Sequence, residues 1–363
     1  MKIVAGAVEQ FEDLTEMGQF VGKIIQSTLP RQSAYEEAIT LVREKAAEKY
    51  EAHGLKKEAA EELSRLYDYI NEMRGAQDAR ASQRSAEYLR GRVELCIHAA
   101  RLLKEIGDID GASQVLKRAS DKVVEMPAND RSVLSYKLLN TQLFDLRHDF
   151  IRAAQKYIEL ARQPAVSHDD RLNCLLCCAR CAVLAEAGPE RANVLAMLVK
   201  DERISSLPCC PFLKKVHFQQ ILRQSDIAAF QGMLEEHQKV LLPGEKMTPL
   251  ARAVMQHNLF SAANIYTSIR LDELGVLLGI KEEEAEAAAA DMIRQKRINA
   301  KIDQIERLLY FNNSLYPYHN ITVCFCSLQF TFFCVHYVQD KILYLRGISI
   351  LTTCAPLLMK QPV

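Results

Sequence analysis

Apolar residues in the middle of the chain recur with the period of an α-helix. They fall at positions i, i+3, i+4 and i+7, which places them along one face of a helix. Such sets are Ala112, Val115, Leu116 and Ala119; Phe150, Ala153, Ala154 and Tyr157; and Ala192, Leu195, Ala196 and Val199. Each set predicts a helix that buries one apolar stripe.

Each of these helices follows a longer helical segment and a short turn. The turns are Ile106 to Asp108, Leu146 to His148 and Ala187 to Pro189. Gly107 and Gly188 suit the left-handed conformation that ends a helix, and Pro189 suits the first turn of the next helix. A repeat of roughly 40 residues is typical of stacked helix–turn–helix pairs. Because one pair cannot bury its stripe alone, the pairs are expected to stack into a solenoid.

The helical pattern extends beyond these repeats. Residues 1–84 predict an N-terminal helical region with two or three charged amphipathic helices. The solenoid is expected to span residues 85–240. Within it, Phe212 to Val240 predicts two further helices, with Ser225 or Asp226 as the cap of the second.

The repeating pattern of paired helices ends near residue 241. Thr248 and Pro249 predict the start of a linker helix, and shorter elements follow it. These are an extended piece at Ile269, a helix from Leu271 to Leu278 ended by Gly279, a helix from Glu282 to Arg297, and strands from Ile298 to Asp303 and from Ile305 to Phe311. Helix, turn, helix and hairpin predict a winged helix within residues 241–311. The expected fold class is therefore all-α, a TPR-like helical-repeat solenoid followed by a small winged-helix subdomain.

Composition narrows the functional classes. The 363 residues contain 46 Lys plus Arg and 46 Asp plus Glu, so no net field favours nucleic acid or an anionic membrane. The apolar start is cut off by Glu9 and is too short for a secretory signal. The eleven cysteines are therefore interpreted as reduced thiols of a protein of the cytoplasm and nucleus.

Four cysteines share one predicted helix face: Cys174, Cys177, Cys178 and Cys181. Thiolates are ligands for zinc and iron–sulfur clusters, so a metal site is one interpretation. However, the four sulfurs would be spread over about 10 Å of one straight helix, too far for a single tetrahedral ion. Reduced Cys also packs as a small apolar side chain. Packing is the preferred interpretation, and no metal is predicted.

The winged helix has two possible binding partners, DNA and another protein. Winged helices often read DNA through their second helix, but here that helix begins with acidic residues between Glu282 and Glu286, which repel phosphate. Arg294, Lys296, Arg297 and Lys301 form only a modest basic end. A protein partner is preferred because the edge of a hairpin can accept a further strand.

Motifs of catalysis and cofactor binding are absent from the sequence. It contains no G-x-x-x-x-G-K loop, no G-x-G-x-x-G and no H-E-x-x-H. Its nine histidines are scattered. No catalytic residue and no cofactor are therefore predicted.

Several runs resemble the PCI-domain family, which builds scaffolds of the proteasome lid, the COP9 signalosome and a translation initiation factor. They are Arg118 to Ser120, Phe150 to Tyr157, Leu184 to Gly188, Met197 to Arg203, His257 to Leu259, Leu274 to Leu278 and Ile302 to Ile305. Within the family, the Leu184 to Gly188 and Met197 to Arg203 runs look more like signalosome subunits than proteasome lid subunits. The resemblance covers about Ser85 to Phe311.

The resemblance implies a non-catalytic scaffold that supports removal of the modifier Nedd8 from cullin-RING ubiquitin ligases by another subunit. That subunit carries a His-x-His motif, which this sequence lacks. The implied partners are other signalosome subunits, above all those with PCI domains, and also cullin-RING ligases, with no nucleic acid and no membrane. A proteasome lid scaffold is the first alternative, and a winged-helix DNA-binding regulator is the second.

The candidate contact surface is the first strand of the hairpin. It comprises Asn299, Ala300, Lys301, Ile302, Asp303 and Gln304. Proline removes a backbone donor, so proline at Asn299 or at Lys301 is expected to weaken docking, with both tested because one could face the chain's own hairpin.

The last segment, residues 312–363, departs from this pattern. It contains four of the eleven cysteines and does not match the long helix that the family has there. Ile321 to Val338 reaches the minimum length of a membrane segment, but Gln329 and His336 weaken that interpretation. A packed part of the domain is a second interpretation. The preferred one is an atypical tail that represents an alternative or artefactual end of the coding sequence, dispensable for folding.

Overall fold

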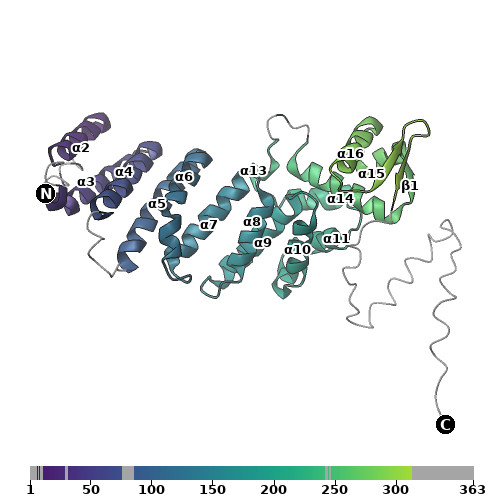
Figure 1. The fold of residues 1–363 in the computed structure, drawn as a ribbon, viewed down its shortest axis with the longest axis horizontal. Coiled ribbons are helices and arrows are strands. Elements are labelled where there is room, and N and C mark those ends of the chain that lie inside the picture. The colour runs from purple at the N-terminus through teal and green to yellow at the C-terminus, as the bar shows by residue number, and fades with distance from the viewer. Residues whose placement is uncertain are drawn as a thin grey trace, which may run out of the picture. The chain divides into compact units, whose positions relative to one another are not determined.

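The structure is a computed structural model that describes residues 11–28, 32–75, 86–241 and 247–312, with Gly6, Val8 and Gly244. Our expectations for the tail after Asn312 lie outside these residues. Within the described part, helices follow one another along the chain, and a small sheet lies together with the last two helices at the C-terminal end (Figure 1). None of these helices is both long and apolar enough to cross a bilayer.

After residue 11, the described N-terminal region contains three charged helices. They are α2 (Leu14–Thr28), α3 (Gln32–Ala52) and α4 (Lys56–Gly75). Gly54 ends α3 in the left-handed conformation, with φ 80°, which is accessible to glycine without steric cost. Met17, Val21 and Val42 form a small core between the first two of these helices.

Helix pairs make up the middle of the chain. The pairs are α5 (Ala86–Ile106) with α6 (Ile109–Val124), α7 (Arg131–Leu146) with α8 (Phe150–Ala161), and α9 (His168–Leu184) with α10 (Pro189–Val199). All four residues of the first predicted stripe are buried in α6, and all four of the second are buried in α8. These two stripes are confirmed, and stacking of neighbouring pairs buries them in two continuous cores.

The third predicted stripe is wrong. In α10 the buried residues are Arg191, Val194, Leu195 and Leu198, whereas Ala192 is exposed. Arg191 turns inward because its guanidinium donates to two carbonyls at the end of α9, Ala182 O at 2.9 Å and Val183 O at 3.1 Å. A buried arginine that satisfies the free carbonyls of a helix end therefore replaces alanine on the inner face.

The turns between helices also differ in part from expectation. Gly107 adopts the predicted left-handed conformation, with φ 91°, and His148 adopts it in the next turn, with φ 61°. Gly188 does not. Its φ of 177° is extended, and it stands immediately before α10 as the N-cap, with Pro189 in the first turn.

Shorter helices join the repeats to the winged helix. They are the 3-10 helix η2 (Glu202–Ser206), α11 (Cys210–His217), α12 (Gln224–Gln231), α13 (Glu236–Lys239) and α14 (Pro249–Ile265). Thr248 caps α14 as predicted, accepting from Ala251 N at 3.3 Å. The N-cap of α12 is Arg223 rather than Ser225 or Asp226, and the Asp226 carboxylate accepts from its backbone N at 3.2 Å.

The C-terminal described part is a winged helix. It consists of β1 (Ser268–Arg270), α15 (Leu271–Leu278), α16 (Glu282–Arg294), β2 (Ala300–Asp303) and β3 (Leu308–Phe311). The strands are antiparallel in the order β1-β3-β2, so the predicted hairpin is joined by a third strand. The second strand of the hairpin begins at Leu308 and not at Ile305, because residues 304–307 form the turn.

Candidate protein-interaction site

The strand β2 lies at the edge of the sheet. Its inner side pairs with β3, and no strand in the described part of the chain pairs with its outer side. Backbone groups on that outer side are therefore available to a partner strand.

The pairing register decides which residues face the open edge. Asn312 N donates to Asn299 O at 2.8 Å, so Asn299 is bonded inward to the chain's own hairpin. Because the bonded pairs of an antiparallel ladder alternate, Lys301 and Asp303 also bond inward. The N–H and C=O groups of Ala300 and Ile302 then point outward. Proline at Asn299 or Lys301 would therefore disturb the chain's own hairpin rather than the open edge, so these two variants do not test docking at that edge.

The side chains of β2 point alternately to the two faces of the sheet. Ala300 is buried and Ile302 packs partly buried against the winged-helix core, whereas Lys301 is exposed on the opposite face. The edge therefore offers outward backbone groups while the apolar side chains of the same two residues anchor the strand. Gln304 lies just beyond β2, and its Nε2 donates to Glu286 Oε1 at 2.6 Å.

The helix α14 connects the winged helix to the preceding helices through buried polar contacts. Asn258 accepts from Leu222 N at 2.8 Å and donates to Leu222 O at 3.1 Å. His257 Nε2 lies 2.9 Å from Gln220 O. Burial lowers the pKa of His257 to about 4, so this imidazole is neutral near pH 7 and its Nε2–H can donate to the carbonyl.

An arginine links the winged helix to the end of the repeats. The Arg297 guanidinium pairs with Glu186 in the α9–α10 turn and donates to Gln256 Oε1 of α14 at 3.2 Å. These residues line a cleft between the α9–α10 turn and α14. In the sequence Arg297 belongs only to a modest basic end, since nothing local reveals a partner 111 residues away.

Other buried polar groups tie the short helices to the repeats. Asp145 at the end of α7 is buried and accepts from Gln238 Nε2 of α13 at 2.9 Å. Arg180 of α9 pairs with Glu235 at 2.5 Å and donates to Met233 O at 3.1 Å. Since a buried charge without partners is costly, these contacts fix the segment that leads into α14.

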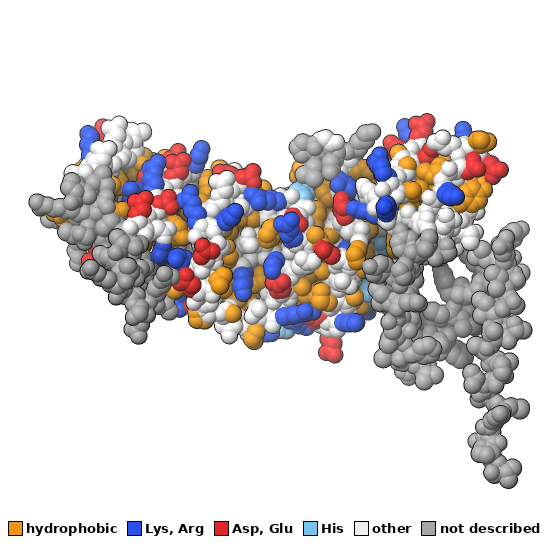
Figure 2. Space-filling view, in the orientation of Figure 1, with side chains coloured by type: hydrophobic (Ala, Val, Ile, Leu, Met, Phe, Trp, Pro, Cys, Tyr) orange, Lys and Arg blue, Asp and Glu red, His pale blue; other side chains and the backbone are white. Residues whose placement is uncertain are grey.

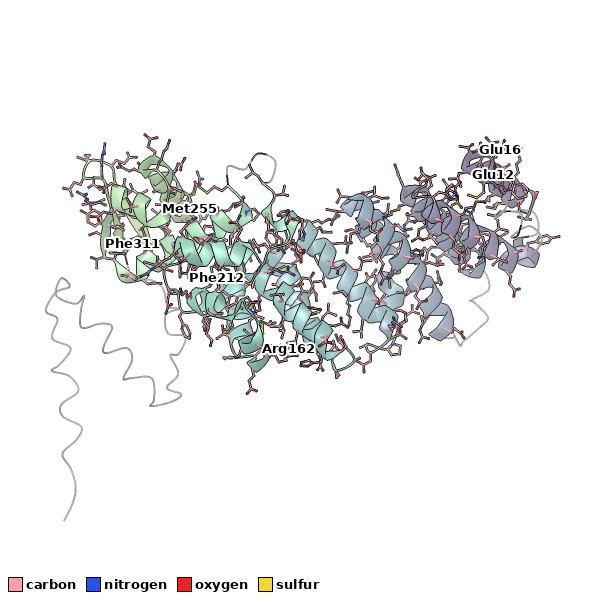
Figure 3. All side chains as sticks on the ribbon, turned by 180° about the vertical axis from the view of Figure 1, so that it is seen from behind. Glu12, Glu16, Arg162, Phe212, Met255 and Phe311 are labelled. Carbon is pink, nitrogen blue, oxygen red and sulfur yellow. The ribbon has the colours of Figure 1, made fainter. Side chains whose placement is uncertain are left out.

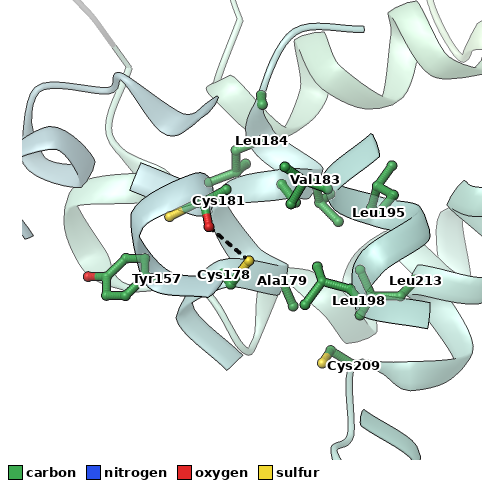
Figure 4. Close-up of a cluster of buried hydrophobic side chains, with 14 of the residues drawn as sticks. Tyr157, Cys178, Ala179, Cys181, Val183, Leu184, Leu195, Leu198, Cys209 and Leu213 are labelled. Atoms are coloured by element: carbon green, nitrogen blue, oxygen red, sulfur yellow. Dashed lines mark hydrogen bonds between the residues drawn. The ribbon is translucent and has the colours of Figure 1, made fainter. Parts of the chain in front are cut away.

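The cysteine helix α9 lies in the core of the repeats (Figure 4). Cys174, Cys178 and Cys181 are buried, Cys177 is partly buried, and Cys178 Sγ donates to Ala154 O at 3.1 Å. Burial raises the pKa of Cys174 to about 11 and raises the pKa values of the other three thiols as well. Protonated, buried thiols fit packing. Among the described residues, no group of three or more His, Cys, Asp and Glu side chains could hold a metal ion.

The second helix of the winged helix is acidic at its start. Glu282, Glu283 and Glu284 lie in its first turn, where they stabilise the helix through its dipole. Arg294 pairs with Asp291, and Arg307 lies 3.5 Å from Glu282. This surface presents acid where phosphate binding requires base. Figure 2 shows acidic and basic side chains interspersed along the visible face of the described residues.

Two separate cores underlie this geometry. Phe311 of β3 belongs to the winged-helix core, and Phe212 of α11 stacks on Phe230 with ring centroids 4.4 Å apart in the core of the repeats (Figure 3).

Helical repeats that lead into a winged helix with an open edge define a PCI-domain protein. The PCI domain family matches residues 218–313.

Comparison with curated proteins shows to which PCI-domain proteins this chain is similar. The chain is similar to COP9 signalosome complex subunit 4 of Arabidopsis thaliana, 36% identical over 84% of this chain and 74% of the relative. It is also similar to the subunit 4 proteins of Dictyostelium discoideum, 35% identical over 82% and 71%, and of Caenorhabditis elegans, 30% identical over 78% and 67%. The chain belongs to the COP9 signalosome subunit 4 family. These alignments cover more of it than the Ser85 to Phe311 stretch in which the resemblance was recognised.

Proposed function

We propose that this chain is a non-catalytic scaffold subunit of the COP9 signalosome. It holds other subunits in register while one of them removes Nedd8 from cullin-RING ubiquitin ligases. Similarity to subunit 4 proteins across most of the chain carries this proposal. No enzyme family is indicated by the comparisons, and the sequence lacks the His-x-His motif of the isopeptidase subunit.

The proposed docking surface is the open edge of β2, made of Asn299, Ala300, Lys301, Ile302, Asp303 and Gln304. Its outward N–H and C=O groups belong to Ala300 and Ile302 and would bond to an added strand of another PCI-domain subunit. Each such main-chain bond contributes about 0.5–1.5 kcal/mol net. The backbone bonds and the side chains beside them would set the orientation of the added strand.

Co-purification tests the assignment. The full chain, tagged and expressed in its own source cells, is expected to recover the other signalosome subunits in stoichiometric amounts by mass spectrometry. The recovered complex is expected to remove Nedd8 from a neddylated cullin, whereas the purified chain alone is not. Recovery of proteasome lid subunits instead, or deneddylation by the chain alone, would refute the proposal.

The alternatives are less well supported. A proteasome lid scaffold shares the PCI domain, but the Arabidopsis and Dictyostelium relatives that align over most of this chain are signalosome subunits. A DNA-binding regulator conflicts with the acidic start of α16. Duplex DNA binding that weakens steeply with added salt would revive that alternative.

The proposed division into parts follows the predicted boundaries. Residues 1–84 act as an N-terminal helical arm, residues 85–240 as the repeat array, and residues 241–311 as the part that docks. The proposed location is the cytoplasm and nucleus, and fluorescence of the tagged full chain in both compartments is the corresponding observation.

A further inference from the structure

The wing of the winged helix presents one apolar side chain to solvent. Ile305, in the turn between β2 and β3, is 96% exposed, the highest value among the large apolar residues that the structure describes. Tight turns favour Gly, Asn, Asp, Pro and Ser, each for a backbone or hydrogen-bonding reason. A branched apolar residue offers the turn none of these advantages.

The turn around Ile305 is held firmly. Asp303 Oδ1 accepts from the backbone N of Ile305 at 3.0 Å and of Glu306 at 3.1 Å. Gln304 bonds to Glu286 at 2.6 Å, and Glu306 accepts from the Tyr310 hydroxyl at 3.2 Å. The side chains on either side of Ile305 are therefore tied back to the domain, while Ile305 itself projects outward.

The surroundings of Ile305 are acidic. The side chains bonded to the turn include the carboxylates of Asp303, Glu306 and Glu286, and Arg307 is paired with Glu282. Because these carboxylates outnumber Arg307 around the turn, the complementary surface is an apolar pocket with a basic rim. Interfaces commonly place such an apolar anchor at the centre, with polar groups around it that exclude water.

We propose that Ile305 is an anchor that inserts into an apolar, basic-rimmed pocket of the protein subunit docked at the β2 edge. Ile305 lies two residues beyond Asp303, at the end of the edge proposed to dock. The inference therefore rests on the proposed function. A rigid turn holds the anchor in place before binding, so little conformational entropy is lost when it is buried. Ile305 would thus supply specificity to an edge whose backbone bonds alone could accept many strands.

Binding of the full chain to the other signalosome subunits of the same source, assembled without it, tests the proposal by biolayer interferometry. Ile305→Ser is expected to raise Kd at least tenfold, mainly through faster dissociation. The matched control is Val276→Ser, which removes another branched apolar residue, 85% exposed on α15. It is expected to change Kd less than twofold. Neither variant should lower the melting temperature, since both side chains are exposed in the free chain.

The basic rim gives a second readout. Ile305→Lys is expected to bind more weakly than Ile305→Asp, and the difference is expected to shrink at high salt. The wild-type association rate should also fall with added salt. Equal binding of Ile305→Ser and wild type would overturn the anchor, and tighter binding of Ile305→Lys than of Ile305→Asp would overturn the basic rim.

The same binding assay distinguishes the Ile305 anchor from docking through the β2 edge. If Ala300→Pro weakens binding but Ile305→Ser does not, the edge docks and Ile305 is no anchor. If neither variant weakens binding, both the edge and the anchor are refuted. Failure of the wild-type chain to bind the assembled subunits would refute the proposed function and this inference together.

Discussion

The helical repeats and the winged helix satisfy their backbone groups in different ways. In the repeats, helices bond internally and bury side chains between neighbours, and even a helix end such as that of α9 is capped by Arg191. In the winged helix, β2 leaves the outward groups of Ala300 and Ile302 without a strand in the described part of the chain. The comparison shows that the described repeats are closed within the chain, whereas the sheet edge leaves open the backbone groups that the proposed docking would use.

The largest expected effect comes from breaking the core of the repeats. Phe230 is fully buried and stacks on Phe212. Phe230→Ala is expected to destabilise the fold by about 3–5 kcal/mol, because it leaves a cavity. Chemical denaturation monitored by circular dichroism measures the change. Phe218→Ala, at a position 63% exposed, is the control and should change stability by about 0.5 kcal/mol or less. A similar loss in both variants would contradict the assigned core.

The next effect is pH dependence at the junction between the two regions. The pKa of His257 is lowered from 6.5 to about 4 by burial, so its contribution to stability is fully present above pH 6.5 and is lost as pH falls toward 4. By linkage the loss is about 3 kcal/mol. The difference in unfolding free energy between wild type and His257→Gln should shrink by that order between pH 7 and pH 4. A difference independent of pH would show that His257 is not held neutral.

The third effect is on association through the open edge. Ala300→Pro removes an outward donor and is expected to weaken binding to the other subunits about tenfold, the equivalent of one main-chain hydrogen bond. Ser268→Pro is the matched control, since Ser268 lies at the opposite edge, on β1, with its N–H directed away from β3. Circular dichroism should show both variants folded. Equal weakening by the two prolines would mean that the sheet, and not the β2 edge, was affected.

The smallest expected effect tests how the two regions are joined. Arg297→Ala removes the contacts to Glu186 and Gln256 and should cost about 0.2–1 kcal/mol, as is typical of partly exposed ion pairs. Reversed charges in a Glu186→Arg, Arg297→Glu double variant should recover part of that loss. If the double variant loses as much stability as the two single variants added together, the Glu186 pair contributes nothing and Arg297 acts mainly through Gln256.

Local pattern was enough to predict much of the fold. The stripes of α6 and α8, the cap at Thr248, the left-handed Gly107 and Gly279, and the bounds of α15 follow from period, capping and backbone preference, all of which act within a few residues. The acidic first turn of α16 is likewise visible in the sequence, where it argues against DNA binding. These features depend on neighbours in sequence, so the sequence displays them directly.

Contacts between distant residues were decided by tertiary structure alone. Arg191 entered the buried face of α10 because carbonyls of α9 needed donors, and this shifted the predicted stripe. The third strand β1 and the register of β2 determined that Ala300 and Ile302, and not Asn299 and Lys301, face outward. Arg297 gained a partner 111 residues away. Sequence by itself determined most helices, the start of α14 at Thr248 and the family resemblance, whereas the direction of each backbone group at the edge depends on pairing partners that only folding brings together.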